Sequence, residues 1–120
     1  MIRSFQDLDV YKEAFDLTII VYKLVKKFPP YEQYELGSQL RRASVSIPAN
    51  IAEGWAKRRF VKEFKHHLDI SLGSCHEMYV HLSIVKELHY IEEKTCLDLM
   101  SRYDHLSGKI FALRKAWKSY

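Results

Sequence analysis

Apolar residues recur at spacings of three and four along most of the chain, which is the period of an amphipathic helix. The first stripe consists of Val10, Ala14, Leu17, Val21, Leu24 and Phe28. Three similar stripes follow, and together they predict helices over about 9–28, 35–55, 61–88 and 94–118. No segment keeps the two-residue period of a half-buried strand, so the pattern predicts an all-α protein.

Short connections join these helices, at 29–34, 54–60 and 89–93. Links of this length place consecutive helices side by side and antiparallel. The sequence contains no internal repeat, low-complexity run or domain linker. We therefore expect one domain over residues 1–120, folded as an antiparallel up-down-up-down four-helix bundle.

Pro48 lies inside the second predicted helix. Proline has no backbone N–H, so the carbonyl of Ser44 loses its usual partner and a kink is expected near 44–48. A break into two shorter helices is the alternative. The helix ends carry signals as well: Asp7 or Asp9 can cap the first helix, and Gly54 suits a left-handed helix terminus.

The first two helices carry more apolar surface than a bundle core needs. Beside or opposite their main stripes lie residues that are apolar, aromatic or small: Tyr11, Phe15, Ile19, Tyr22, Val45, Ala49 and Ala52. A second apolar face is typical of a helix that packs against another subunit. We expect these residues to form an oligomer interface, although single exposed apolar side chains are also common on monomers.

Composition limits the class of protein. The 120 residues are 48% hydrophobic and 28% charged, which fits a globular domain and excludes a disordered chain. The N-terminus lacks the apolar region of a signal peptide, and the longest apolar stretch, 17–22, is too short to span a membrane. Together with the two cysteines, Cys75 and Cys96, these features predict a reduced cytoplasmic protein.

Basic residues concentrate in one part of the sequence. The net charge of +4 permits a polyanionic partner without requiring one. The cluster consists of Arg41, Arg42, Lys57, Arg58, Arg59, Lys62 and Lys65. Trp55 and Phe60 lie among them, and cations beside aromatic rings suit phosphates and unstacked bases. These basic residues are our candidate nucleic-acid site, and the alternative is an ordinary solvated face.

Candidate catalytic and metal-binding residues are sparse. Glu63-x-x-His66 has the spacing of a di-iron ligand pair but occurs once, and Glu77 with His81 lacks a third ligand. Cys75 falls in the apolar stripe of the third helix, where a thiol acts as a small hydrophobe. Four further histidines are expected at the surface, namely His76, His81, His89 and His105. With no nucleophile elbow and no glycine-rich phosphate loop, we expect neither enzyme activity nor a metal or other cofactor.

One long motif is recognisable. The segment SQLRRASVSIPANIAEG, residues 38–54, resembles the signature of the four helix bundle protein family, which is also called the S23 or 23S rRNA intervening-sequence protein family. The opening FQDLDVY, 5–11, is similar to the N-terminal motif of that family, and FPPYEQYEL, 28–36, to its first turn. GSCHE, 73–77, and LHYI, 88–91, match its third helix and the turn that follows. The resemblance thus covers nearly the whole chain in order.

The resemblance implies an antiparallel four-helix bundle that assembles into a homopentameric ring or barrel. Many members are encoded within bacterial 23S rRNA genes, and the family has no established catalytic activity. A related branch, the accessory protein of diversity-generating retroelements, binds nucleic acid and a reverse transcriptase. For this chain we therefore expect a non-catalytic scaffold that binds RNA or DNA. The alternative is a protein-interaction scaffold for a reverse transcriptase or another enzyme.

Three residues at the end of the signature have a physical interpretation. Asn50 and Glu53 lie three residues apart on one helix, with Arg42 on a neighbouring part of the surface. Such side chains suit a polar network between helices or subunits, or a cap for the turn at Gly54. We expect Asn50, Glu53 and Gly54 to act in structure rather than in chemistry.

Overall fold

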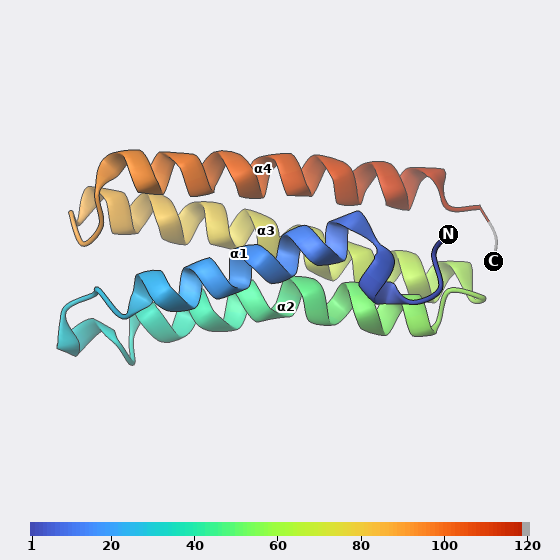
Figure 1. The fold of residues 1–120 in the computed structure, drawn as a ribbon, viewed down its shortest axis with the longest axis horizontal. Helices are drawn as coiled ribbons and strands as arrows, with labels where there is room; N and C mark the ends of the chain where they lie inside the picture. The colour runs from blue at the N-terminus through green and yellow to red at the C-terminus, as the bar shows by residue number, and fades with distance from the viewer. Residues whose placement is uncertain (119–120) are drawn as a thin grey trace.

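Four long helices make up the protein in the computed structural model, which describes residues 1–118 (Figure 1). They are α1 (Asp9–Val25), α2 (Leu36–Ala56), α3 (Val61–Glu87) and α4 (Glu93–Ala116). Two short 3-10 turns, η1 (Phe5–Asp7) and η2 (Pro30–Glu32), precede α1 and α2. Consecutive helices run in opposite directions in a body of 46 × 23 × 22 Å. The predicted all-α architecture of four packed helices is confirmed.

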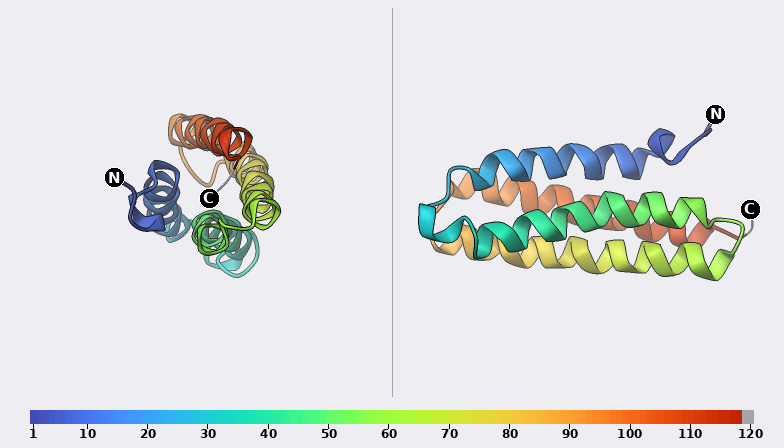
Figure 2. Two further views of the ribbon diagram at one scale, coloured as in Figure 1. Left: turned by 90° about the vertical axis from the view of Figure 1, so that its right-hand side faces the viewer. Right: turned by 90° about the horizontal axis from the view of Figure 1, so that it is seen from below.

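The helices pack in chain order around the bundle, as the end-on view in Figure 2 shows. Extensive contacts join α1 to α2, α2 to α3 and α3 to α4, whereas α1 and α4 touch much less. The N-terminus and the end of α4 lie at the same end of the bundle as the turn between α2 and α3. The other end holds the connection between α1 and α2 and the turn between α3 and α4.

The core is built from the apolar stripes that the sequence displays. The largest fully buried side chains include Leu17, Leu40, Ile47, Ile51, Phe64, Leu68, Met78, Leu82, Tyr103, Leu106 and Ile110. Cys75 is 1% exposed and belongs to this core, as predicted. Burial of each large apolar side chain contributes about 1.5–3 kcal/mol, so packing holds the helices together. No helix within residues 1–118 is long and apolar enough to cross a membrane.

Pro48 is accommodated inside one uninterrupted helix, so the alternative of two shorter helices is wrong. The Ser44 carbonyl, which lacks the N–H of residue 48, accepts a hydrogen bond of 3.1 Å from the hydroxyl of Thr18 on α1. The same hydroxyl is 2.9 Å from the Ala14 carbonyl of its own helix. The neighbouring helix therefore replaces the bond that proline removes.

The N-terminal segment is capped differently from the sequence prediction. Neither Asp7 nor Asp9 caps α1, whose N-cap is Leu8 with no side-chain hydrogen bond. Asp7 closes η1 instead: its carboxylate accepts the backbone N–H groups of Arg3 at 2.8 Å and Ser4 at 3.1 Å. These two hydrogen bonds to the charged form lower the pKa of Asp7.

Gly54 serves close packing rather than a left-handed helix end, which corrects the sequence prediction. No described glycine has a positive φ, and α2 continues past Gly54 to Ala56. A Cβ atom at position 54 would lie 2.8 Å from the Cβ of His67 and 3.1 Å from a ring carbon of Phe64. Glycine is required here because α2 and α3 approach each other too closely for a side chain.

Candidate functional site

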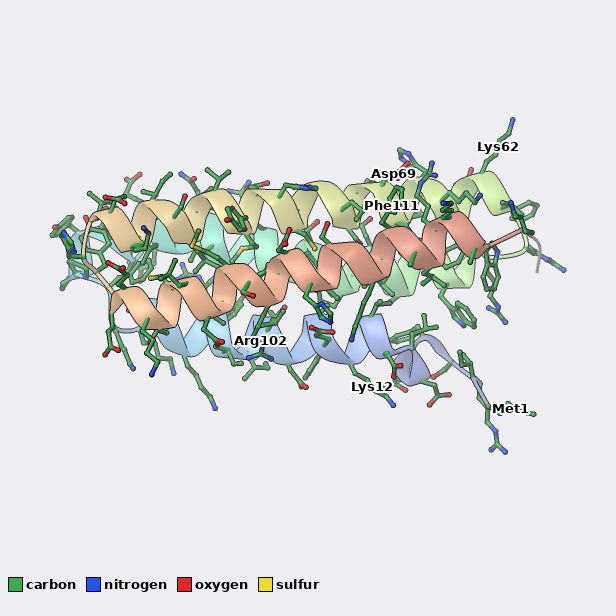
Figure 3. The ribbon with its side chains drawn as sticks, turned by 90° about the horizontal axis from the view of Figure 1, so that it is seen from above. Met1, Lys12, Lys62, Asp69, Arg102 and Phe111 are labelled. Carbon is green, nitrogen blue, oxygen red and sulfur yellow. The ribbon has the colours of Figure 1, made fainter. Side chains whose placement is uncertain are left out.

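Positive charge gathers at the end of the bundle where the N-terminus and the end of α4 lie. The turn between α2 and α3 carries Lys57, Arg58 and Arg59, and the first turns of α3 add Lys62 and Lys65. Figure 3 shows Lys62 extending outward at the end where Met1 also lies. The last turn of α4 contributes Lys115 and Arg114, although the Arg114 guanidinium is paired with the Asp69 carboxylate of α3. The opposite end mixes lysines with acidic residues, namely Glu32, Glu35, Glu87, Glu92 and Glu93. A modest net charge is therefore unevenly distributed along the molecule.

A cluster of aromatic rings fixes this basic end. The Trp117 ring at the end of α4 lies 4.9 Å from the Phe64 ring and 5.7 Å from the Trp55 ring, both edge-on. The Arg58 guanidinium lies 4.4 Å from the centre of the Trp55 ring and donates to the Trp55 carbonyl at 3.0 Å. The Trp117 indole N–H donates to the Arg58 carbonyl at 3.4 Å. These contacts hold the α2–α3 turn against the end of α4. The Trp55 ring packs against Phe64 and Trp117.

The cations at this end differ in how they are engaged. Arg59 and Lys62 are exposed and Lys65 is half-buried. Within residues 1–118, none of these three forms an ion pair. Lys57, in contrast, contacts His67 of α3 and Glu53 of its own helix, α2. The positive charges of Arg59, Lys62 and Lys65 are therefore not neutralised by an ion pair within residues 1–118.

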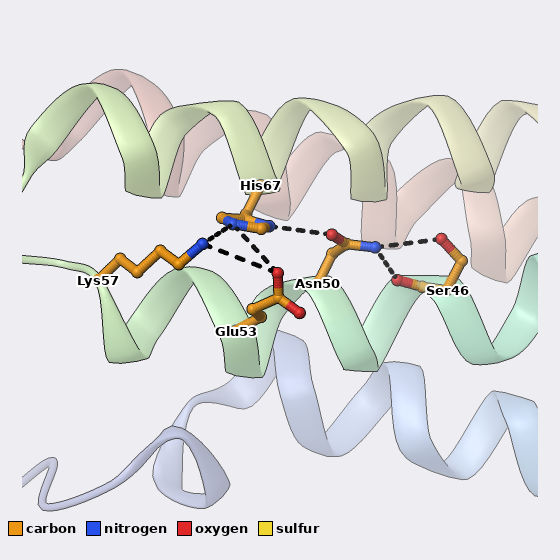
Figure 4. A network of polar contacts seen from close by, with 5 residues as sticks. All are labelled: Ser46, Asn50, Glu53, Lys57 and His67. Carbon is orange, nitrogen blue, oxygen red and sulfur yellow. Dashed lines mark hydrogen bonds and ion pairs between the residues drawn. The ribbon is translucent and has the colours of Figure 1, made fainter.

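The contacts of Lys57 belong to a polar network between α2 and α3 (Figure 4). At its centre His67 is 6% exposed, and its Nδ1 lies 3.0 Å from the Asn50 side-chain oxygen. The Asn50 amide nitrogen donates to the Ser46 carbonyl at 2.9 Å, which fixes the orientation of the amide. His67 Nδ1 therefore donates to the Asn50 oxygen, and His67 Nε2 lies 3.2 Å from the Lys57 ammonium nitrogen. Glu53 completes the network, 3.4 Å from the same nitrogen.

This network places Asn50 and Glu53 between two helices of one chain, one of the arrangements expected from the sequence. Arg42 does not take part in it. The sequence alone did not single out His67. A signal was available, because His67 lies three residues after buried Phe64 and four before buried Ser71, on the side of α3 that faces the core.

The sequence model of the family described as 23S rRNA-intervening sequence protein matches residues 6–112. The chain belongs to this family. A search of curated proteins returns no match. The family match contains the whole 38–54 motif and reaches into the last turns of α4, so the resemblance stated from the sequence is confirmed.

In this member of the 23S rRNA-intervening sequence family, the predicted basic cluster divides into two. Arg41 and Arg42 lie near the start of α2, about 22 Å along the helix from Lys57 at 1.5 Å per residue. Arg41 is half-buried, and its guanidinium donates to the Gln33 carbonyl at 2.9 Å. Arg42 lines a polar groove of about 410 Å³ with neighbours that include Glu77. The structure brings Lys57, Arg58, Arg59, Lys62 and Lys65 together at the other end of the helix.

The predicted interface residues do converge. Six of the seven line one apolar groove of about 320 Å³ between α1 and α2, together with Phe5, Thr18 and Pro48. Phe15 and Ile19 from α1 are 48% and 42% exposed, and Val45 from α2 is 40% exposed. Tyr22 is exposed further along α1 and is not among the residues that line the groove. The surplus apolar faces of the first two helices thus form one continuous surface.

The candidate metal ligands do not assemble into a site. Within residues 1–118, no group of three or more His, Cys, Asp or Glu side chains could hold a metal ion. Glu63 and His66 are both exposed near the start of α3. His81 is 8% exposed rather than on the surface, which corrects the prediction for it, and its Nε2 lies 3.0 Å from a Glu77 carboxylate oxygen.

The buried thiols are poor nucleophiles. Burial, with a smaller effect from the negative charge of Glu13, raises the pKa of Cys75 to about 12. Burial also raises the pKa of Cys96. Since the thiolate is the reactive form, both cysteines act as packing residues at neutral pH.

Proposed function

We propose that this protein is a non-catalytic scaffold that assembles into a ring and binds nucleic acid by its phosphates. The observation that supports binding is the cluster of cations at one end of the bundle. Arg59, Lys62 and Lys65 lie there without ion-pair partners among residues 1–118, and the aromatic cluster holds their turn in place. Long basic side chains of this kind contact phosphate oxygens and release counterions, without reading base sequence.

The apolar groove between α1 and α2 supports assembly. A ring requires two different surfaces on each copy, one that contacts the preceding copy and one that contacts the next. The groove is one such surface. Exposed apolar side chains on α3 provide a second: Ile70, Val80 and Ile84, at 38%, 54% and 41% exposure. These surfaces lie on different helices, so they suit a closed ring, such as the pentamer implied by the resemblance.

Assembly would strengthen weak phosphate contacts. Rotation about a ring axis keeps the direction of each subunit relative to that axis. If the bundles stand along the axis, every basic end therefore lies on the same face of the ring. A polyanion that contacts several copies gains affinity through effective concentration, although each copy carries a net charge of only +4.

Salt-dependent binding tests the phosphate contacts. The double variant Arg59→Glu/Lys62→Glu reverses two exposed charges at the basic end. Its matched control, Lys26→Glu/Lys27→Glu, makes the same change in net charge among exposed residues at the opposite end. In an anisotropy titration with a structured RNA, we expect wild type to bind with steep salt dependence and the control to bind like wild type. Equal loss in both variants would show that net charge matters and that the basic end does not.

Solution mass tests the ring. Wild type should elute as a multiple of 14.3 kDa in light scattering coupled to gel filtration, and Ile19→Glu in the groove should reduce it toward one copy. Tyr34→Glu, at a side chain that is 87% exposed outside the groove, should leave the mass unchanged. A monomeric wild type would contradict the ring. The groove would then favour the alternative function, an accessory subunit that binds a different protein.

A further inference from the structure

We propose that Phe60 is a stacking platform for an unpaired base, so that the basic end selects single-stranded over double-stranded nucleic acid. This inference rests on the proposed function, because the same cations hold the phosphates that flank the base. It adds the class of nucleic acid and the residue that selects it.

The Phe60 ring is exposed while its backbone is fixed. The side chain is 59% exposed at the junction between the α2–α3 turn and α3. The Phe60 N–H donates to the Lys57 carbonyl at 2.9 Å, and the Phe60 carbonyl accepts the Phe64 N–H at 3.0 Å. The ring borders a cleft of about 360 Å³ whose other lining residues are Lys57 and Glu63. A ring held in this way loses little conformational entropy when a base stacks on it.

Other aromatic rings at this end are already engaged. Trp55, Phe64 and Trp117 pack edge-to-face against one another. The Arg58 guanidinium lies over the Trp55 ring at 4.4 Å. In the α2–α3 turn, Phe60 therefore offers the aromatic surface that a base can reach.

The charges around the cleft set the direction in which a nucleotide lies. The Arg59 guanidinium lies over one face of the Phe60 ring, 5.9 Å from its centre, and leaves the other face to a base. Exposed Lys62 follows in the first turn of α3. The Glu63 carboxylate lines the cleft itself and repels phosphate from it. The base therefore enters the cleft against Phe60, and its phosphates lie at the rim beside Arg59 and Lys62.

Stacking on Phe60 discriminates between strands. In a duplex both faces of an internal base are covered by its neighbours, so a protein ring reaches a base face only where the strand is unpaired. Phosphate contacts alone favour the duplex, which has the higher charge density. A preference for single strands would therefore come from Phe60 and not from the cations.

A three-probe titration tests the assignment. The probes are an unstructured RNA of about 12 nucleotides, a DNA strand of the same sequence, and the corresponding DNA duplex. We expect Phe60→Ala to weaken binding of both single strands by about 5- to 10-fold, to leave duplex binding unchanged, and to keep the salt slope. Phe60→Tyr should retain wild-type affinity. Lys62→Gln should weaken binding of all three probes and flatten the slope by about 0.7–0.9.

Matched outcomes separate this inference from the proposed function. Tyr34→Ala removes an 87% exposed aromatic ring at the opposite end and should change nothing. If Phe60→Ala keeps single-strand affinity within about twofold while Lys62→Gln loses it, the stacking platform is wrong and phosphate binding stands. If wild type binds none of the probes at about 50 mM salt, the proposed function fails and the inference fails with it. Equal affinity for RNA and DNA strands is expected, because neither stacking nor phosphate contact reads the 2′-hydroxyl.

Discussion

Substitution of Thr18 by valine tests how α2 accommodates an internal proline. Valine has nearly the shape of threonine but no hydroxyl. The substitution removes the 3.1 Å hydrogen bond from Thr18 to the Ser44 carbonyl and leaves the packing of α1 almost unchanged. Ser44 is 0% exposed and Pro48 provides no N–H, so the carbonyl loses its donor in a site that water does not reach.

The expected cost follows from that burial. A buried acceptor without a partner costs about 1–3 kcal/mol. Valine recovers part of this because a methyl group replaces a hydroxyl at a residue that is only 8% exposed. We therefore expect Thr18→Val to reduce the free energy of unfolding by about 1–2 kcal/mol. The midpoint of thermal unfolding should fall by about 4 °C for each kcal/mol in a domain of this size.

A double-mutant cycle with Pro48→Ala isolates the interaction. Alanine at position 48 restores the N–H that bonds Ser44 within the helix, so Thr18→Val should cost almost nothing in that background. Urea unfolding followed by circular dichroism measures all four proteins at one concentration, because assembly makes stability depend on concentration. A coupling energy of about 1 kcal/mol is expected. An equal cost of Thr18→Val in both backgrounds would refute the role assigned to this hydroxyl.

Two further predictions concern packing and pH. Gly54→Ala should lower the free energy of unfolding by about 1–2 kcal/mol, because the new Cβ would lie 2.8 Å from the His67 Cβ. Gly73→Ala is the matched control, because a Cβ added at position 73 would have no neighbouring atom within 4 Å. Its higher helix propensity should raise the free energy of unfolding by about 0.5–1 kcal/mol, measured by thermal unfolding. Alkaline unfolding tests Cys75, whose pKa is raised from 9.0 to about 12 in the folded protein. Between these values the unfolded chain loses a proton that the folded chain keeps, so stability should fall as pH rises above 9.0, by up to about 1.4 kcal/mol per pH unit. Urea titrations across this range should show a shallower fall for Cys75→Ala, and an unchanged slope would contradict the assignment.

The sequence predicted features that repeat along a helix. Leu17, Val21 and Ile47 lie in stripes with the helical period, and all three are buried. The outward faces were predictable by the same period, so Phe15 and Ile19 were assigned to a second surface, and they line the groove. Periodicity succeeds here because the side of a helix on which a residue lies depends on local backbone geometry alone.

Contacts between helices required the tertiary structure. The basic residues were grouped by their closeness in sequence, but about 22 Å of helix separates Arg42, near the start of α2, from Lys57 at its end. The hydroxyl of Thr18 and the imidazole of His67 act on residues 26 and 17 positions away, at distances in sequence where no pattern predicts a contact. The sequence by itself determined which residues form helices and which of their faces are apolar, because these depend on neighbours within a few residues. The tertiary structure decided which side chains meet and where the charge gathers, because only the packing of the helices sets those distances.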